Sequence, residues 1–219
     1  MRSAAIITAA GYGSRMGLEK NKILLPLNDS TVIETAVRSF LTSNDIQKII
    51  ITHTREDKNE LQYALKNISI PLTFIEGGST RQKSVYNGLK HLIDYDPVTV
   101  LIHDAARPWI SESLITHVLK KAEQTGSAAP VMTSVNAMKK IDDSGKIIEH
   151  LQREKTVSAQ TPQGFDFKKI LEAHTKADAE GYEAIDDTEL WDRYFDRVST
   201  VSGEVGNIKI TFKKDLEQR

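Results

Sequence analysis

The sequence has 219 residues, which is enough for one α/β domain with a substantial buried core and hardly enough for two. Hydrophobic residues make up 39% of the chain, and 29 basic against 30 acidic residues give a formal net charge of -1. This balance argues against a general nucleic-acid-binding protein, and the lack of cysteine excludes disulfides, thiolate catalysis and Cys-ligated metals. The apolar run at residues 1–7 is too short for a signal peptide or a membrane span, so we expect a cytoplasmic protein without membrane contact.

The first part of the chain alternates strand-like and helix-like segments. Compact apolar runs predict buried parallel strands, and apolar residues at helical spacing predict helices between them. The predicted strands cover residues 4–9, 48–53, 72–75, 98–103 and 128–132. The predicted helices cover residues 31–41, which open with the capping box Thr31-x-x-Glu34, and residues 56–67, 81–93 and 111–124. This alternation indicates a Rossmann-like α/β fold with a mostly parallel sheet and helices on both faces.

The alternation breaks after Met132. Residues 138–141 and 146–151 flank a turn at residues 142–145, which predicts a β-hairpin inserted into the α/β domain. A lone hairpin is marginally stable, so we expect it to pack on something, such as another subunit. Further on, the sequence predicts a short strand near Val157, helices over 167–174 and 187–194, and strands over 198–201 and 207–211. We predict one domain over residues 1–219, with the hairpin as a β-arm at about 134–159.

A glycine-rich loop follows the first predicted strand. It contains Gly11, Gly13 and Gly17, with Arg15 inside it and Lys22 shortly after it. Glycines let the backbone approach a ligand, and successive free N–H groups form a nest for phosphate oxygens. The spacing matches neither the dinucleotide fingerprint nor a P-loop, so both of those interpretations are weak. A flexible connection with solvated charges remains the alternative for this loop.

Further candidate residues gather after other strands. Asp104, in the run His103-Asp104-Ala105-Ala106-Arg107-Pro108, could hold a ribose hydroxyl or help position Mg²⁺, although a capping Asp and a surface Arg would explain the same run. Gly77-Gly78 leads into a helix whose start holds Arg81 and Ser84 and offers free N–H donors, although a plain turn before a capped helix would look similar. Arg153 and Lys209 are isolated cations late in the chain.

Together, these motifs give the chain a resemblance that no single motif carries. It resembles the 2-C-methyl-D-erythritol 4-phosphate cytidylyltransferases of the non-mevalonate isoprenoid pathway, which share a glycosyltransferase-A-type nucleotidyltransferase fold. The matching stretches occur in family order and span nearly the whole chain. They are residues 9–17, Lys22-x-x-x-Pro26-Leu27, residues 77–85, residues 103–108, Gln160-Thr161-Pro162-Gln163 and residues 207–211.

The resemblance implies a role for each candidate residue. Arg15 and Lys22 would stabilise charge at the α-phosphate of CTP, while Arg153 and Lys209 would orient the polyol phosphate, so these four are the implied catalytic residues; Arg107 would join the last two in binding this substrate. Asp104 would lie near the ribose and the Mg²⁺-triphosphate, with Mg²⁺ held mainly by phosphates. The arm would exchange contacts in a homodimer. The implied nucleotide-binding residues are Ala9, Ala10, Gly11, Gly13, Gly78, Arg81, Ser84, Asp104 and Ala105.

The residue types suit such a transfer. The nucleophile is itself a phosphate that is largely dianionic at neutral pH, so no general base is required. What the reaction requires is that two polyanions are brought together and that charge on a five-coordinate phosphorus is stabilised, which Arg, Lys and Mg²⁺ achieve by position and field.

The arm departs from the family pattern at one point. The family usually has Asp-Thr where this chain has Asn136-Ala137, and that threonine contacts the acceptor phosphate. This departure leaves a ribitol-5-phosphate or other polyol-phosphate cytidylyltransferase open as an alternative. Separate alternatives are a nucleotide-sugar pyrophosphorylase and a non-catalytic nucleotide sensor. The presence of both Arg15 and Lys22 argues against the sensor, because a mere binder needs no transition-state charges.

Overall fold

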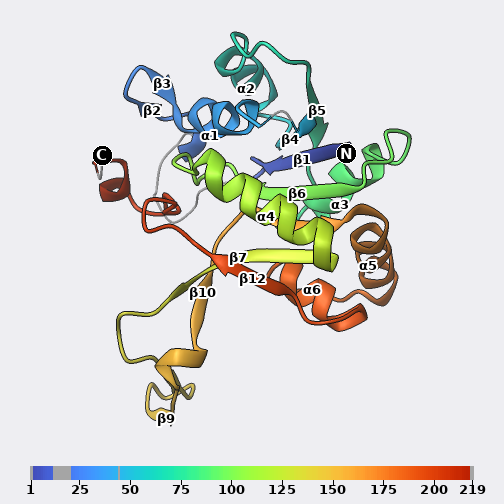
Figure 1. Cartoon of the computed structure of the whole chain (residues 1–219). Coiled ribbons are helices and arrows are strands. Elements are labelled where there is room, and N and C mark those ends of the chain that lie inside the picture. Colours follow the sequence, from blue (N-terminus) through green and yellow to red (C-terminus); the bar gives the residue numbers. More distant parts are fainter. Residues whose placement is uncertain (1, 12–20, 44, 218–219) are drawn as a thin grey trace.

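A computed structural model describes residues 2–11, 21–43 and 45–217. Within these residues, eight strands form one sheet in the order β10-β7-β11-β6-β1-β4-β5, and β12 also pairs with β7 (Figure 1). The strands are β1 (Ser3–Thr8), β4 (Ile46–His53), β5 (Leu72–Glu76), β6 (Thr99–Asp104), β7 (Ser127–Thr133), β10 (Val157–Ala159), β11 (Gln163–Asp166) and β12 (Ser199–Ser202). β1 runs parallel to both β4 and β6, and β4 runs parallel to β5, which confirms the mostly parallel α/β fold.

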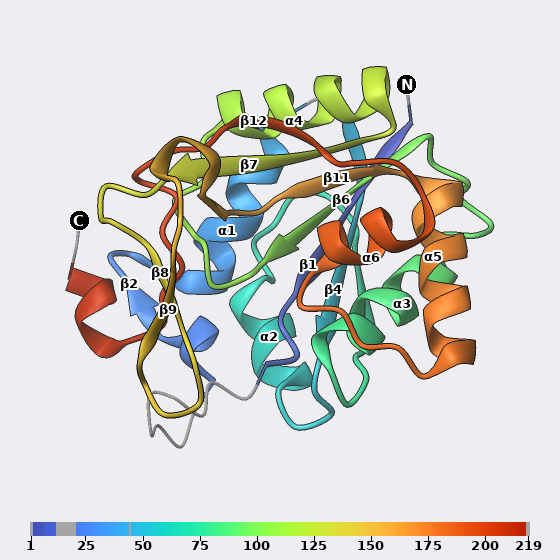
Figure 2. The same cartoon turned by 90° about the horizontal axis from the view of Figure 1, so that it is seen from below.

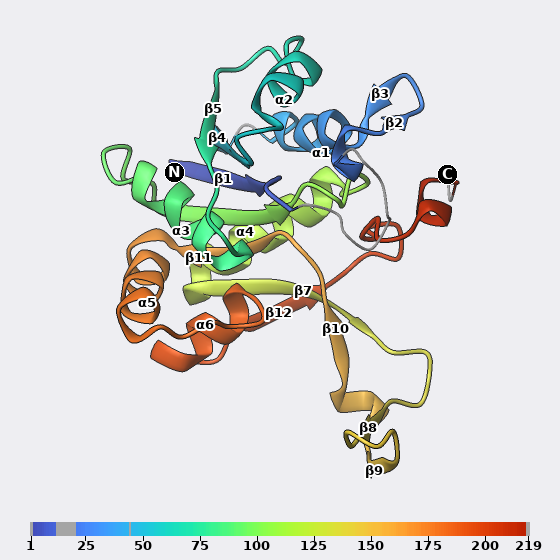
Figure 3. The same cartoon turned by 180° about the vertical axis from the view of Figure 1, so that it is seen from behind.

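Helices cover both faces of the sheet, as Figures 1 and 3 show from opposite sides. Successive residues of β1 point to opposite faces: Ile7 joins the core under the helices of one face, and Ile6 joins the core on the other. The first face carries α1 (Val32–Leu41), α2 (Lys58–Ala64) and α4 (Glu112–Thr125), and the second carries α3 (Arg81–His91), α5 (Phe167–Glu180) and α6 (Asp187–Tyr194). Among the described helices, none is long and apolar enough to span a membrane.

Most predicted elements are confirmed with small shifts at their ends. α1 begins after Thr31, whose side chain accepts a hydrogen bond from Glu34 N, as its capping sequence predicts. α2 is shorter than predicted, and α5 continues well past His174. Short elements that the sequence did not predict also occur, namely β2 (Pro26–Leu27), β3 (Ser30–Thr31) and the 3-10 helices η2 (Lys22–Leu24), η3 (Arg153–Lys155) and η4 (Lys213–Glu217).

One expected strand is absent, and one observed strand was not expected. Residues 207–211 form an irregular segment rather than a strand, because Ile210 N donates a single hydrogen bond to Ala106 O and no ladder forms. β11 was not predicted, and it runs antiparallel between β6 and β7 in the middle of the sheet. Its central Gly164 lies so close to Leu101, Val118 and Ala122 that a Cβ there would meet their side chains at 3.0–3.1 Å.

The predicted hairpin is present and projects from the sheet as an arm (Figures 1 and 3), and the view from below in Figure 2 shows β8 and β9 in front of the rest of the chain. Its strands β8 (Lys139–Ile141) and β9 (Ile147–His150) are antiparallel, and every residue in them is exposed. The chain leaves the sheet at Thr133 and returns at Val157, and these two residues are paired partners of β7 and β10. The arm is thus an excursion that starts and ends on one strand pair.

Candidate active site

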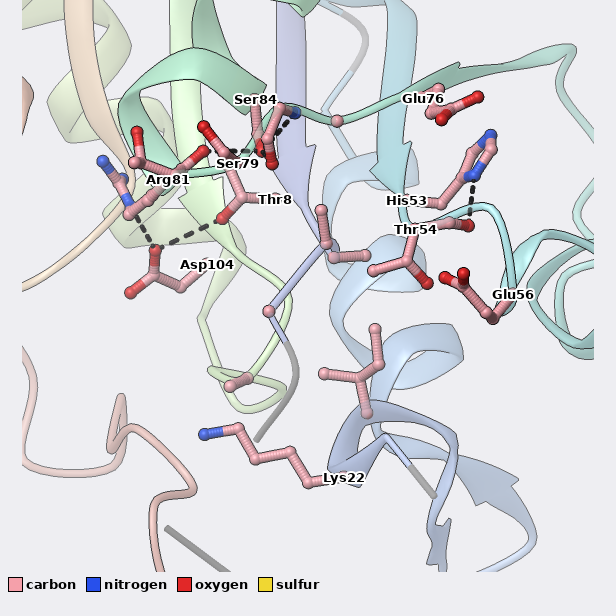
Figure 4. Close-up of a pocket in the computed structure, with 18 of the residues that line it drawn as sticks. Thr8, Lys22, His53, Thr54, Glu56, Glu76, Ser79, Arg81, Ser84 and Asp104 are labelled. Atoms are coloured by element: carbon pink, nitrogen blue, oxygen red, sulfur yellow. Dashed lines mark hydrogen bonds and ion pairs between the residues drawn. The ribbon is translucent and has the colours of Figure 1, made fainter. Parts of the chain in front are cut away.

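A pocket of about 690 Å³ opens at the carboxyl ends of the parallel strands (Figure 4). Its lining comes from the segments that follow β1, β4, β5 and β6, together with the irregular segment that carries Lys209. The carboxyl edge is where ligands bind in open α/β sheets. The residues predicted from four separate motifs therefore meet in one place.

The double glycine forms a wall of this pocket. Ser84 Oγ accepts from Gly78 N at 3.0 Å and donates to Thr80 O at 2.9 Å, which ties the start of α3 to the turn before it. A Cβ on Gly77 would lie 2.6 Å from Ala10 Cβ and 2.7 Å from Ser84 Oγ. Glycine is therefore required at position 77 so that the turn can approach the segment after β1.

Asp104, the last residue of β6, is the centre of the charged cluster. Arg81 Nε donates to its Oδ1 at 3.1 Å, and Lys209 Nζ donates to its Oδ2 at 2.6 Å. Thr8 Oγ1 lies 3.4 Å from Oδ1, and Arg107 Nε lies 4.0 Å from Oδ2. Lys209 thus reaches the pocket as predicted, although the residues around it do not form a strand.

Arg81 bridges two carboxylates. Its second edge donates from Nη1 to Asp187 Oδ2 at 2.6 Å, and Asp187 Oδ1 in turn lies 3.1 Å from His174 Nε2. Asp187 and His174 come from α6 and α5, and both are buried. Neither residue was predicted to belong to the site; the only sequence signal was a pair of acidic residues at a helix start.

Burial and charge act against each other in this cluster. Burial alone would raise the pKa of Asp104, but Arg81 and Lys209 outweigh it and hold this pKa far below its usual range. Burial would also raise the pKa of Asp187, yet Arg81 and His174 lower it to about 2. Burial would lower the pKa of Arg81, and the carboxylates of Asp187 and Asp104 raise it instead. Both aspartates are therefore ionised and Arg81 is charged at neutral pH.

A buried hydrogen-bond chain supports Asp104 from behind. Asp104 N donates to Thr161 Oγ1 at 3.1 Å, and this hydroxyl lies 3.0 Å from His103 Nδ1. His103 Nε2 faces Arg107 O at 3.1 Å, so the proton of a neutral imidazole lies on Nε2. Burial lowers the pKa of His103 to about 4, which keeps the ring neutral at physiological pH.

Lys22 lies in η2 and lines the same pocket (Figure 4). Its Nζ donates to Ile210 O at 2.7 Å, which links the segment after the glycine loop to the segment of Lys209. Asn21 fixes the backbone beside it, because its Nδ2 donates to Ala9 O at 3.2 Å and to Asp57 Oδ2 at 2.8 Å. The predicted residues Gly13 and Arg15 lie outside the described residues.

The opposite side of the pocket carries two carboxylates and was not predicted. His53, Thr54, Glu56 and Glu76 lie there, away from the Arg81–Asp104 pair (Figure 4), and Arg55 pairs with Glu76 at 3.4 Å. His53 ends β4 and Glu76 ends β5, while Thr54 and Glu56 follow β4, so their position at strand ends was the signal available in the sequence.

The remaining predicted residues divide into three groups. Ala9, Ala10, Gly11, Gly78 and Ser84 line the pocket, whereas Ala105 is buried next to Asp104 in the sequence and Arg107 lies beside that aspartate. Arg153 is exposed in η3 on the returning side of the arm and does not line the pocket of its own chain.

A protein-held metal does not fit this cluster. Both carboxylate oxygens of Asp104 already face cationic donors, which would repel a divalent ion placed on them. In the part of the chain that the structure describes, no three His, Cys, Asp or Glu residues are grouped so that they could hold a metal. The cations instead gather on one side of the pocket, where Lys22, Arg81 and Lys209 outnumber the single carboxylate of Asp104, and this side suits a polyanionic ligand.

Comparisons with known proteins agree with this geometry. The sequence model of the family described as IspD, 2-C-methyl-D-erythritol 4-phosphate cytidylyltransferase, matches residues 3–218. The enzyme of that description from Thermotoga neapolitana is 37% identical over 215 residues, covering 98% of this chain and 94% of the relative.

Solved structures give the same picture. That of 4-diphosphocytidyl-2C-methyl-D-erythritol synthase from Anaerococcus prevotii superposes with a TM-score of 0.87 at 28% identity, covering 99% of this chain and 93% of that one. That of 2-C-methyl-D-erythritol 4-phosphate cytidylyltransferase from Thermus thermophilus has a TM-score of 0.79 at 31% identity, covering 99% and 96%.

Proposed function

Because this chain belongs to the 2-C-methyl-D-erythritol 4-phosphate cytidylyltransferase family, we propose that its pocket transfers CMP from CTP to 2-C-methyl-D-erythritol 4-phosphate. The products are CDP-methylerythritol and pyrophosphate, in non-mevalonate isoprenoid precursor synthesis. The observation that carries the proposal is the cluster of Arg81, Asp104, Lys209 and Lys22 around one pocket at the carboxyl edge of the sheet.

The chemistry is a substitution at the α-phosphorus of CTP. A phosphate oxygen of the acceptor forms a bond to that phosphorus, and the bond from the α-phosphorus to the bridging oxygen breaks. Pyrophosphate leaves with the electron pair of the broken bond. The acceptor phosphate is already ionised, so no side chain has to remove a proton in this step.

We propose that the cations divide the work by position. Lys22, with Arg15 in the glycine loop, stabilises charge at the α-phosphorus, and Lys209 with Arg107 orients the acceptor phosphate. Asp104 holds Arg81 and Lys209 in place and lies near the ribose. Ala10, Gly11, Gly78 and Ser84 offer backbone groups and a hydroxyl to the nucleotide, because the Gly77 turn brings these segments into contact.

We propose that Mg²⁺ enters with the nucleotide. Phosphate oxygens would hold it, which is how Mg²⁺ is usually bound in nucleotide-using enzymes. It would supply Lewis-acid stabilisation of the phosphates when bound. Asp104 does not fit as a direct ligand of Mg²⁺, because both of its carboxylate oxygens already accept hydrogen bonds from Arg81 and Lys209.

We also propose that residues 1–219 act as one nucleotidyltransferase domain that pairs as a homodimer. The support is the arm, which exposes Val135, Ile141, Ile147 and Ile148 and has no core of its own. Arg153 on this arm would then complete the partner's site, since it does not line the pocket of its own chain. We expect the enzyme to act in the cytoplasm.

The test is pyrophosphate release from nucleotide and acceptor pairs with Mg²⁺. We expect CTP to be preferred over UTP, ATP and GTP, and methylerythritol phosphate to give the highest kcat/KM. Ribitol phosphate and erythritol phosphate belong in the same panel because of Asn136-Ala137. A higher kcat/KM with ribitol phosphate would make ribitol phosphate the acceptor instead. Equal turnover with UTP would contradict the expected preference for cytosine, and no pyrophosphate release with any pair would contradict the proposal that the protein is an enzyme.

A further inference from the structure

The described contacts of Arg81 divide its guanidinium between the pocket and the interior. Its Nε faces Asp104 in the pocket, and its Nη1 faces Asp187, which does not line the pocket. The side chain of Arg81 is 30% exposed and that of Asp187 is 2% exposed. The edge away from the ligand space is thus held by a carboxylate that solvent does not reach.

Asp187 is itself fixed by neighbours from two helices. Its Oδ1 lies 3.1 Å from His174 Nε2, and the His174 ring stacks on Tyr86 at 6.0 Å between centroids and 14° between planes. Asp186, the N-cap residue before Asp187, accepts hydrogen bonds from Thr188 N and Glu189 N, which fixes the start of α6. The carboxylate of Asp187 therefore has little freedom to follow Arg81 if the arginine moves.

On this geometry we propose that Asp187, held by His174, is the positioning residue that sets where Arg81 lies in the nucleotide pocket. The orientation of the Arg81 guanidinium matters because Arg81 also contacts Asp104, and Asp104 contacts Lys209. A guanidinium released by Asp187 would be free to turn toward Asp104 and would lose its fixed position in the nucleotide pocket. This proposal rests on the proposed function, since it assigns a cause to the placement of that site's cations.

Charge alone predicts the opposite result from positioning. Removal of the Asp187 charge leaves the pocket more positive, and a more positive pocket attracts a nucleotide triphosphate more strongly. If Asp187 instead positions Arg81, its removal misorients the guanidinium and weakens nucleotide binding. The direction of the change therefore separates the two explanations.

The principal variant is Asp187→Asn, which keeps the size of the side chain. Two donors face the carboxylate, Arg81 Nη1 and His174 Nε2, whereas an asparagine offers them one acceptor oxygen. The matched control is Asp192→Asn on the same helix, because Asp192 bonds to Arg197 Nη1 at 2.8 Å and to Val198 N at 3.1 Å and does not contact the described pocket. A second variant, His174→Phe, keeps a ring against Tyr86 and removes the donor to Asp187.

The measurements are KM for CTP and kcat from pyrophosphate release, and the dissociation constant of CTP from calorimetry without acceptor. For Asp187→Asn we expect both KM and the dissociation constant to rise by roughly tenfold or more, as for a lost hydrogen bond to a charged group. We expect kcat to stay within about threefold, because the contact is present before and during the reaction. His174→Phe should shift the same quantities in the same direction by less, and Asp192→Asn should shift neither.

A purely structural role would lower the melting temperature and the fraction of active enzyme, and it would leave KM unchanged. Unchanged or tighter CTP binding in folded Asp187→Asn would overturn the proposal; if that variant does not fold, the same result in His174→Phe would overturn it. A wild-type protein that binds CTP but releases no pyrophosphate would contradict the proposed function alone. The effect of Asp187 on the CTP dissociation constant can still be measured by calorimetry, because this measurement needs no turnover.

Discussion

The charged side chains of the pocket are held by partners far away in the sequence, whereas the arm is held by its sequence neighbours. Asp104 bonds to Arg81 and Lys209, which are 23 and 105 residues away. In the arm, Asp142 accepts from Ser144 and Lys146, and Lys139 contacts His150 across one strand pair. Long-range contacts fix the cations of the pocket within one chain, while the arm leaves its apolar side chains in solvent. The comparison indicates that the pocket is formed by contacts within one chain, and the exposed apolar side chains of the arm support the proposal that it packs against a second subunit.

The largest effect should come from removing a pocket cation. We expect Lys22→Ala to lower kcat by about a hundred- to a thousandfold and to raise KM for CTP much less, because one preorganised donor is worth about 2.7–4 kcal/mol in the transition state. Steady-state kinetics with CTP and methylerythritol phosphate measure both constants. Lys168→Ala is the control, since that lysine pairs with Asp96 on the surface. A near-normal kcat would remove Lys22 from the catalytic residues.

The arm can be tested by complementation between two inactive variants. If Arg153 acts in the partner's site, Arg153→Ala and Lys22→Ala protomers should each be impaired, and an equal mixture should regain activity. Random exchange in a symmetric dimer makes half of the dimers mixed, each with one intact site, so about a quarter of wild-type activity should return. Sedimentation measures the oligomeric state in parallel. An active monomer, or a mixture without recovery, would show that the arm does not serve a partner's site.

The buried hydrogen bonds of His103 behind the pocket predict a pH-dependent contribution to stability. The folded pKa of His103 is about 4 and its ordinary value is 6.5, so the unfolded state takes up a proton first as the pH falls. This contribution to stability is complete above pH 6.5 and is lost as the pH falls toward 4, by about 3 kcal/mol at the limit.

Urea unfolding of the wild type and of His103→Gln at pH 7 and pH 4.5 measures this contribution. The variant should lose less stability between the two pH values, and the difference between the two proteins isolates His103 from other titrating groups. His150→Gln, on the exposed strand β9, is the matched control. An equal loss of unfolding free energy between pH 7 and pH 4.5 in the wild type and in His103→Gln would show that His103 is not kept neutral by the fold.

The smallest effect concerns the acceptor side of the arm. Ala137→Thr adds a hydroxyl donor that could reach the acceptor phosphate, so KM for that substrate should fall by roughly tenfold or less while CTP binding stays constant. Ala137→Val, which has a similar shape and no hydroxyl, separates hydrogen bonding from size. An equal gain with valine would mean that packing, rather than a hydrogen bond, improves the acceptor site.

Most of the fold and part of the candidate site could be predicted from the sequence. Apolar runs and helical spacing predicted the parallel strands because those segments are buried on both faces, as in residues 4–7 of β1. β11 was missed because Pro162 and Gly164 disfavour a central strand by propensity, and only the close approach of Leu101 and Ala122 shows why glycine is used there. Residues 207–211 looked like a strand because of alternation, yet Asn207 and Lys209 bond to Thr161 O and Asp104 instead of a ladder.

The site was predictable where a motif followed a strand and not where helices met it. Asp104 and Lys209 were named from short motifs, but their mutual contact depends on how the end of the chain returns to β6. Asp187 and His174 are 13 residues apart on two helices, and their side chains meet only after α5 and α6 pack on α3. Pairing of this kind is a tertiary result that local pattern does not contain.

The ladder between Thr133 and Val157 has a consequence for modularity. Since these two residues face each other as antiparallel partners, residues 134–156 form a loop whose ends already meet. We expect that replacing that loop by a two-residue hairpin turn such as Asn-Gly would remove the arm without opening the sheet, since a shorter loop lowers the entropic cost of closure. The length and sequence of the arm should therefore be exchangeable while β7 and β10 keep their register.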